Sequence, residues 1–156
     1  MAWTNSKIFT TYLTDIINNT TAMDLNTDAS LKVALYNNTP TPSQSVTSAN
    51  SAYAVDQWVV GNEVSEAGQW AAGGVALASV TSTFATNVYT FDAADTASGS
   101  AADLASVFGC LVYDDTITTP VADQGICFNY FGGSNSVVNG TFTTVWAAGG
   151  ILALTL

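Results

Sequence analysis

The sequence has no histidine, no arginine and only two lysines, Lys7 and Lys32. Without histidine there is no Ser-His-Asp or Cys-His pair, and no imidazole ligand for zinc. Without arginine the usual clamps for phosphate and carboxylate groups are also missing. We therefore expect a protein that is not an enzyme and that carries no cofactor.

The same shortage of positive charge argues against two kinds of partner. Nucleic-acid binding draws its affinity from basic side chains that neutralise phosphates, and two lysines 25 positions apart form no patch. An anionic membrane surface is disfavoured for the same reason. No apolar run approaches the roughly 18 residues of a membrane-spanning helix. We expect contact with neither nucleic acid nor a membrane.

Cysteine is also scarce, with only Cys110 and Cys127. A small disulfide scaffold would carry more, and the first residues, MAWTNSKIFTT, lack the basic and apolar regions of a signal peptide. We predict two buried free thiols in a reducing compartment. A disulfide between neighbouring strands remains the alternative.

Acidic and uncharged polar residues are abundant. Twelve Asp and Glu give a net charge of −10, and the chain has 22 threonines, 14 serines and 12 asparagines. Threonine favours strands because its branched β-carbon fits a pleated surface. The composition fits either an ordinary acidic soluble protein or a protein that serves as an ordered, exposed or assembled surface. The length of 156 residues predicts one domain, 1–156.

The N-terminal residues repeat apolar side chains at helical spacing. A helix is predicted over 4–19, within an N-terminal segment 1–20, with Thr4 or Ser6 as N-cap. It should lie across a sheet or against another subunit. Its apolar stripe consists of Ile8, Phe9, Tyr12, Leu13, Ile16 and Ile17.

From Leu31 onward the apolar period is two, which predicts strands. About seven or eight short strands separated by turns, after one helix, predict a mainly β fold. We expect an antiparallel β-sandwich or jelly-roll-like barrel over 31–156. The predicted strands are LKVALYN, VALASVTSTF, NVYTFDA, ASVFGCLVYDD, GICFNYF, GTFTTVW and GILALTL, with QWVVGNEV as a further candidate and SANSAYAV as a short helical turn.

The stretch NYFGGSNSVVNGTFTTVW, residues 129–146, contains two turn signals among strand-like runs. Gly132–Gly133 predicts a turn, and Asn139–Gly140 predicts a two-residue hairpin because both residues tolerate positive φ. The hairpin would present Phe142 and Trp146 on one face. The other glycine pairs, Gly73–Gly74 and Gly149–Gly150, also adjoin strands and lack the Gly-Lys-Ser/Thr ending of a phosphate loop.

Carboxylates are the remaining candidates for catalysis. Glycoside hydrolysis needs two carboxyl groups about 5–10 Å apart, and Glu63 with Glu66, or Asp114 with Asp115, supply such pairs in sequence. Adjacent aspartates at the end of a strand are more often turn formers. We favour the turn interpretation.

Calcium is considered because of the acidic stretch DAADTASGSAAD, which contains Asp92, Asp95 and Asp103. Its spacing does not match a helix-loop-helix calcium loop and it lacks the closing glutamate. We predict a surface loop and no metal site.

Aromatic residues suggest one alternative function. Trp58, Trp70 and Trp146 could stack sugars, as in a carbohydrate-binding module, but in a sandwich of this size aromatics mostly form the core or a subunit interface. We predict core or interface.

The order of several motifs resembles a group of small structural proteins of tailed bacteriophages. The motifs are GGVALASVT (73–81), CLVYDDT (110–116), YFGGSNSVVNGTFTTVW (130–146) and GILAL (150–154), preceded by LKVALYN (31–37) and QWVVGNEV (57–64). The resemblance covers most of the chain. It carries over no catalytic residue, and the near-absence of basic residues departs from the pattern.

The resemblance implies a virion structural protein, most often a capsid decoration or minor capsid protein on the outside of the head, assembled in the host bacterial cytoplasm. Its expected partners are the major capsid protein and two further copies in a homotrimer. A net charge of −10 fits a position away from packaged DNA. The helix 4–19 and the loop 38–50 are the candidate capsid contacts. A tail-associated structural protein and a carbohydrate-binding β-sandwich are the alternatives.

Overall fold

The computed structural model describes residues 3–21, 24–26 and 30–156. Residues 1 and 2 of the predicted N-terminal segment lie outside that range. Strands account for 40% of the chain and helices for 13%, so the mainly β class is confirmed.

The strands are spread along the chain from its N-terminal to its C-terminal region. They are β1 (Lys7–Ile8), β2 (Leu31–Tyr36), β3 (Val75–Ala76), β4 (Thr81–Ala85), β5 (Val88–Asp92), β6 (Thr96–Ala97), β7 (Ala102–Asp114), β8 (Gly125–Gly140), β9 (Thr143–Thr144) and β10 (Leu152–Thr155). The helices are α1 (Thr10–Ile17) and α2 (Ser48–Ser51), with the 3₁₀ helices η2 (Asp56–Trp58) and η3 (Val60–Asn62).

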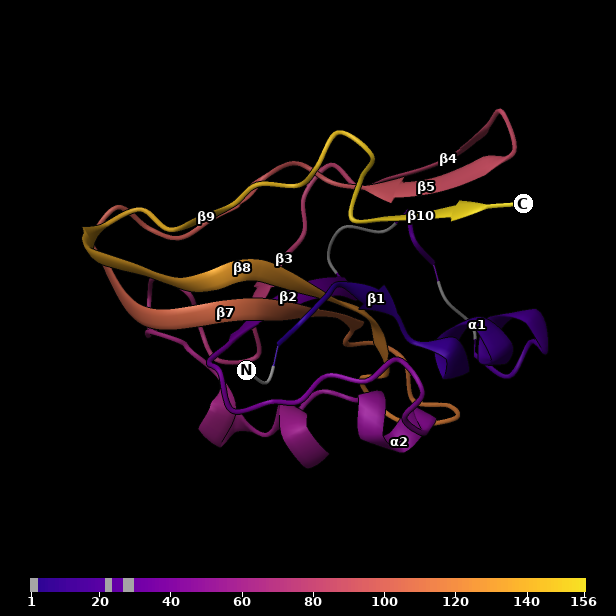
Figure 1. Cartoon of the computed structure of the whole chain (residues 1–156), viewed down its shortest axis with the longest axis horizontal. Coiled ribbons are helices and arrows are strands. Elements are labelled where there is room, and N and C mark those ends of the chain that lie inside the picture. The colour runs from indigo at the N-terminus through magenta and orange to yellow at the C-terminus, as the bar shows by residue number, and fades with distance from the viewer. Residues whose placement is uncertain (1–2, 22–23, 27–29) are drawn as a thin grey trace.

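These strands form three antiparallel sheets. The largest has the order β1-β8-β7-β2-β3, the second has the order β10-β5-β4, and β6 pairs with β9. Figure 1 shows the two smaller sheets on one side of the five-stranded sheet and α2 on the other, with α1 at one end. The arrangement confirms a β-sandwich-like fold with an N-terminal helix.

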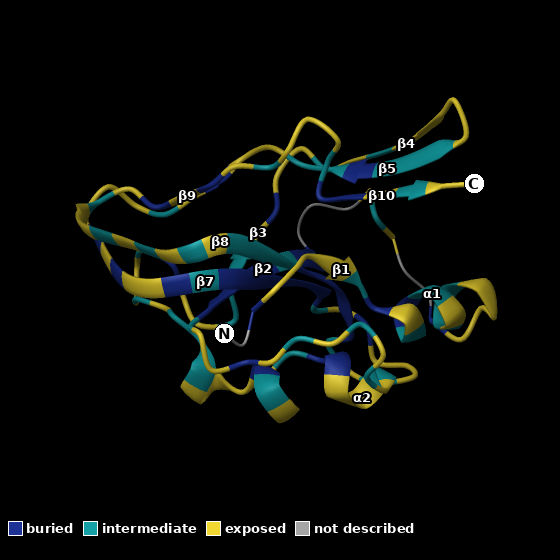
Figure 2. Ribbon diagram, viewed as in Figure 1, coloured by how far each residue is buried: buried dark blue, intermediate teal, exposed yellow. Residues whose placement is uncertain are grey.

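Aromatic side chains fill the core beneath the five-stranded sheet. Trp3 and Tyr36 both pack edge-on against Trp58, with ring centroids 5.7 and 5.1 Å apart, and Phe9 packs on Phe128 at 5.3 Å. All five are buried, and the buried residues in Figure 2 concentrate along β2 and the adjoining parts of β7 and β8. Each such ring pair contributes about 0.5–1.5 kcal/mol beyond the area it buries.

The helix is shorter than the sequence predicts, because residues 6–9 are used by the sheet. Tyr130 donates its backbone N–H to Ser6 Oγ at 2.9 Å, β1 pairs with β8, and the Phe9 N–H bonds to the Ile126 carbonyl at 3.1 Å. Phe9 is the N-cap residue and makes no side-chain cap, so the predicted caps Thr4 and Ser6 are wrong. Strand pairing has overridden the helical period over the first turns.

The strand predicted in QWVVGNEV is also wrong. Residues 56–58 and 60–62 form η2 and η3, and only Glu63 makes an isolated bridge, to Tyr36. The positive φ of Ala54 and Asp56 turns the chain so that Trp58 enters the core. The short helical turn predicted in SANSAYAV is confirmed as α2.

The prediction for residues 129–146 is wrong in both of its turns. Gly132–Gly133 lies inside the single strand β8, in an irregular segment between the Tyr130–Gly109 and Asn135–Val107 pairs with β7. Asn139–Gly140 closes no hairpin, because β9 pairs with β6 rather than with β8. The Phe142 N–H donates to Ser98 Oγ at 2.8 Å, which draws the chain away from β8.

The two cysteines are buried free thiols, as predicted. Cys110 pairs in register with Asn129, and Cys127 pairs with Val112, so the thiols are diagonal neighbours on adjacent strands. Burial raises the pKa of Cys127 to about 12 and raises the pKa of Cys110 further. Both are therefore protonated and unreactive at neutral pH.

Candidate functional site

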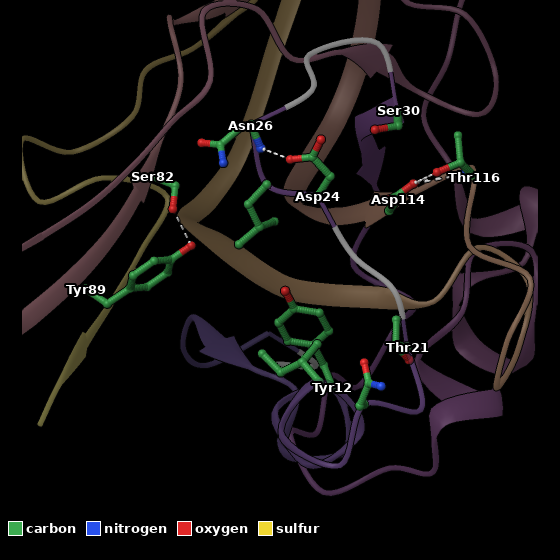
Figure 3. Close-up of a pocket in the computed structure, with 12 residues that line it drawn as sticks. Tyr12, Thr21, Asp24, Asn26, Ser30, Ser82, Tyr89, Asp114 and Thr116 are labelled. Carbon is green, nitrogen blue, oxygen red and sulfur yellow. Dashed lines mark hydrogen bonds between the residues drawn. The ribbon is translucent and has the colours of Figure 1, made fainter.

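A pocket of about 760 Å³ opens between α1, β4, β5 and the end of β7. Figure 3 shows Tyr12 on α1 at one side of it and the Ser82–Tyr89 pair at another. The described lining residues are Tyr12, Ile16, Asn19, Thr21, Asp24, Leu25, Asn26, Ser30, Ser82, Tyr89, Asp114 and Thr116. We call it the Tyr12 pocket.

The carboxylates of the Tyr12 pocket are used to shape turns. Asp24 Oδ1 accepts the Asn26 N–H at 2.8 Å, and Asp114 Oδ1 accepts the N–H and the hydroxyl of Thr116 at 2.8 and 2.5 Å. Burial raises the pKa of Tyr12, so its phenol is neutral at physiological pH. No described lining residue is basic, so the pocket disfavours anions.

The carboxylates proposed as a catalytic pair have separate structural roles. Glu63 accepts hydrogen bonds from the Tyr53 hydroxyl at 2.8 Å and the Gly73 N–H at 2.9 Å, whereas Glu66 accepts the N–H of Asp103 at 2.7 Å. Burial raises the pKa of Glu63, although the hydrogen bonds from Tyr53 and Gly73 oppose the shift. The Glu63 bonds tie loops to one another, and the Glu66 bond ties its loop to β7.

The aspartate pair is divided in the same way. Asp114 forms the turn described above, as its position at a strand end predicts, while Asp115 makes a 2.7 Å ion pair with Lys32. The two carboxylates bond to different partners and do not converge on one point.

The acidic stretch considered for calcium does not converge on one point. Asp92 bonds the N–H of Ala93, Asp95 bonds that of Trp146, and Asp103 bonds that of Asn139. Among residues 3–21, 24–26 and 30–156, no three acidic or cysteine side chains are grouped as metal ligands. These carboxylates fix backbone N–H groups in two loops and near the end of β8.

Two of the tryptophans considered for sugar stacking belong to the core, as predicted. Trp58 and Trp70 are fully buried, and the Trp70 indole N–H donates to the Val33 carbonyl at 3.2 Å. Neither can offer a ring face to a ligand. Trp146 is half-buried.

Two features escaped the sequence analysis. The first is a pocket of about 390 Å³ between β8 and the segment around β9, which we call the β8–β9 pocket. Its position depends on the pairing of β9 with β6 rather than with β8. The local sequence does not indicate that pairing. The second is a run of exposed valines, Val55, Val59 and Val60, whose exposure follows from the 3₁₀ turns.

Comparison with known proteins gives no relative: no family model, curated protein or solved structure matches this chain. Within the part of the chain that the structure describes, no helix is long and apolar enough to cross a membrane.

Proposed function

We propose that this protein is a non-enzymatic virion structural protein of a tailed bacteriophage, a decoration protein on the outer surface of the capsid. The ordered motifs between residues 31 and 154 support the class. The negative charge supports the outside, because a chain with net charge −10 is repelled by packaged DNA. The proposed partners are the major capsid protein and two further copies in a homotrimer.

The observation that carries the proposal is a surface with little charge formed by residues 37–62, which we call the docking face. Its only charged residue is Asp56, although the chain has twelve acidic side chains. Val55, Val59 and Val60 are exposed on it, Val60 to 53%. A surface with one charge and several exposed apolar groups is the part of an acidic protein that another protein covers at least cost.

The docking face is held rigidly from beneath. Trp58 is fully buried, and its carbonyl accepts the Tyr36 hydroxyl at 2.6 Å. The Asn62 amide donates to the Gln57 carbonyl at 2.8 Å, which fixes η2 against η3. A preordered surface loses less entropy on binding, which favours a decoration role over a flexible linker.

The test uses particles of the phage that carries the gene, stripped of this protein or assembled without it. Purified wild-type protein should bind heads at high copy number, and Val60→Asp should reduce the bound amount at least tenfold. The matched control is Val138→Asp, which adds the same charge at an exposed valine on β8. Bound copies are counted by gel densitometry and located by electron microscopy.

Two other outcomes would indicate a different contact surface or a different role. If Val60→Asp binds capsids fully and Ile17→Asp does not bind, the capsid contact lies on α1, whose Ile17 is 80% exposed. Protein found only on tails, at a few copies, would contradict the decoration role and favour the tail-associated alternative.

A further inference from the structure

Strand β4 forms an edge of the three-stranded sheet, because it pairs with β5 alone. It has five residues, whereas the other described strands at sheet edges have two to four. Figure 1 shows β4 beyond β5 at the outer border of the molecule, and four of its five residues are exposed. An exposed strand edge carries backbone N–H and C=O groups that can pair with another chain.

The pairing within the β4–β5 hairpin shows which backbone groups these are. The strands are joined by the two-residue turn Thr86–Asn87, where both residues have positive φ, and their register is continuous. In such a hairpin the residues that flank the turn bond to each other and the bonding then alternates, so the odd-numbered residues of β4 bond to β5. The N–H and C=O groups of Ser82 and Phe84 therefore point away from β5, and no other described residue bonds to them.

β4 lacks the features that commonly protect a sheet edge. Those features are charged side chains, proline and bulges, and Thr81–Ala85 contains none of them. No residue from 67 to 91 is charged, and Asp92 is the only charged residue in the strands of this sheet. Two chains of charge −10 can therefore approach along β4 without placing acidic groups against each other.

We propose that β4 pairs with β4 of a second copy, antiparallel and about a two-fold axis at Thr83. In this register Ser82 pairs with Phe84 of the second copy, and Phe84 pairs with Ser82 of the second copy, so each of the outward N–H and C=O groups finds a partner. The pairing joins the two three-stranded sheets into one continuous sheet. A second copy is the occupant that the edge matches, because the same outward groups serve both sides of the contact.

The side chains on both faces of β4 suit this register. Thr83 faces its own counterpart directly, in a pair without mutual hydrogen bonds, where side chains come closest and threonine pairs are stabilising. On the other face the two Phe84 rings are diagonal neighbours, a separation that aromatic side chains span. Phe84 is 60% exposed and is the only aromatic among the exposed large apolar side chains of the described residues. The pairing covers it.

The contact is distinct from the assembly proposed above. It has two-fold symmetry, whereas the homotrimer needs a three-fold contact, so β4 would join one homotrimer to another. It does not depend on the capsid role, because only copies of this chain take part.

The first experiment measures self-association of the full chain without capsids. Sedimentation velocity over a concentration series should show reversible association into an even number of copies. Thr83→Asp should weaken the association about tenfold or more, because two carboxylates then face each other across the axis. Thr143→Asp is the matched control, since it adds the same charge at an exposed threonine of β9 and should leave the association unchanged. Near-UV circular dichroism checks that each variant is folded.

Hydrogen exchange followed by NMR identifies the backbone groups involved. Protection of the Ser82 and Phe84 amides should rise with protein concentration, because only the second copy bonds to them. The Thr83 amide bonds to β5 in either state and should be protected at every concentration.

Cysteine variants test the register of the pairing. In oxidised glutathione, Thr83→Cys should form a disulfide with its counterpart, since directly opposed residues lie within disulfide distance. Ala85→Cys is the control, because it is exposed on the same face but faces Thr81 of the second copy, and it should link far less. The native Cys110 and Cys127 are buried and do not compete.

The proposal would be overturned by any of four results. These are no association at millimolar concentration, association that Thr83→Asp leaves intact, equal cross-linking of Thr83→Cys and Ala85→Cys, or protection of the Ser82 and Phe84 amides only when capsids are added. The last result would make a capsid protein the occupant of the edge.

Discussion

At the scale of single residues, Glu63 joins loops that are distant in sequence. Its two oxygens accept hydrogen bonds from the Tyr53 hydroxyl and the Gly73 N–H. Tyr53 stacks on Tyr113 at 4.9 Å, and the Tyr113 hydroxyl donates to the Gly73 carbonyl at 2.6 Å. The carboxylate is therefore part of the packing, and its protonation state affects stability.

The raised pKa of Glu63 predicts a pH dependence of folding. Burial makes the folded state bind the proton more tightly than the unfolded state, whose glutamate titrates near 4.5. This contribution to stability is fully present below that value and is lost as pH rises through the folded pKa. Glu63→Gln should flatten the fall in unfolding free energy between pH 4.5 and neutrality. Urea unfolding across that range measures it.

Glu66→Gln is the matched control for this prediction, because it removes the same charge from the same loop. If the two variants change the pH profile equally, the effect comes from net charge rather than from the burial of Glu63.

At the scale of elements, β8 owes its shape to an irregular segment at 131–134. Tyr130 pairs with Gly109, but the next pair joins Asn135 to Val107, so five steps along β8 match two along β7. Gly132 adopts φ of +81° within this segment. Such bulges re-aim side chains, and here the irregularity places Phe131 in the wall of the β8–β9 pocket.

The two adjacent glycines provide a test of that backbone. A Cβ at either Gly132 or Gly133 would meet nothing within 4 Å, but only Gly132 has positive φ. Gly132→Ala should therefore cost about 1–2 kcal/mol, whereas Gly133→Ala should be near neutral or slightly stabilising. Thermal and urea unfolding compare the pair. Equal losses for both would show that the conformation of Gly132 is not what the fold requires.

Strands whose own residues follow a regular apolar pattern were predictable from the sequence. β2 and β7 carry apolar residues on both faces and pair with each other in register, and their limits lie close to those expected. β5 and β10 were likewise found from their alternation.

The predictions that failed concern segments whose structure is set by contacts with residues distant in sequence. Residues 7 and 8 have helical periodicity but pair with β8, more than a hundred positions away. Val59 and Val60 favour strands locally, yet burial of Trp58 sets 3₁₀ turns there. The β8–β9 pocket was out of reach for the same reason, since it needs β9 to pair with β6.

At the scale of the whole molecule, charge is distributed unevenly along the chain. Asp123 is the only charged residue in 116–156, and the docking face has one more, so most acidic groups lie elsewhere. Copies that approach through surfaces with little charge avoid direct contact between acidic groups, which would add to the repulsion between two chains of charge −10. The proposed homotrimer and capsid contact both require such surfaces.

The N-terminal residues complete the core, and this decides how the capsid contact can be tested. Trp3 and Phe9 are fully buried, and the Trp3 indole N–H donates to the Asn37 carbonyl at 2.8 Å. Removing residues 1–9 deletes two buried aromatics, each worth about 3–5 kcal/mol when truncated, from a fold whose total stability should be about 5–15 kcal/mol. We expect the shortened chain to lose cooperative thermal unfolding and near-UV circular dichroism.

Removal of Leu156 alone is the control for that deletion, because its side chain is exposed at the other end of the chain and its loss should change the melting temperature little. A shortened chain, lacking residues 1–9, that melts cooperatively near the full-length temperature would contradict the role given to Trp3 and Phe9. If the prediction holds, loss of capsid binding after deletion of residues 1–20 reports unfolding rather than the loss of a contact. Point changes such as Ile17→Asp and Val60→Asp are therefore the variants that separate α1 from the docking face, because both side chains are exposed and their substitution leaves the aromatic core intact.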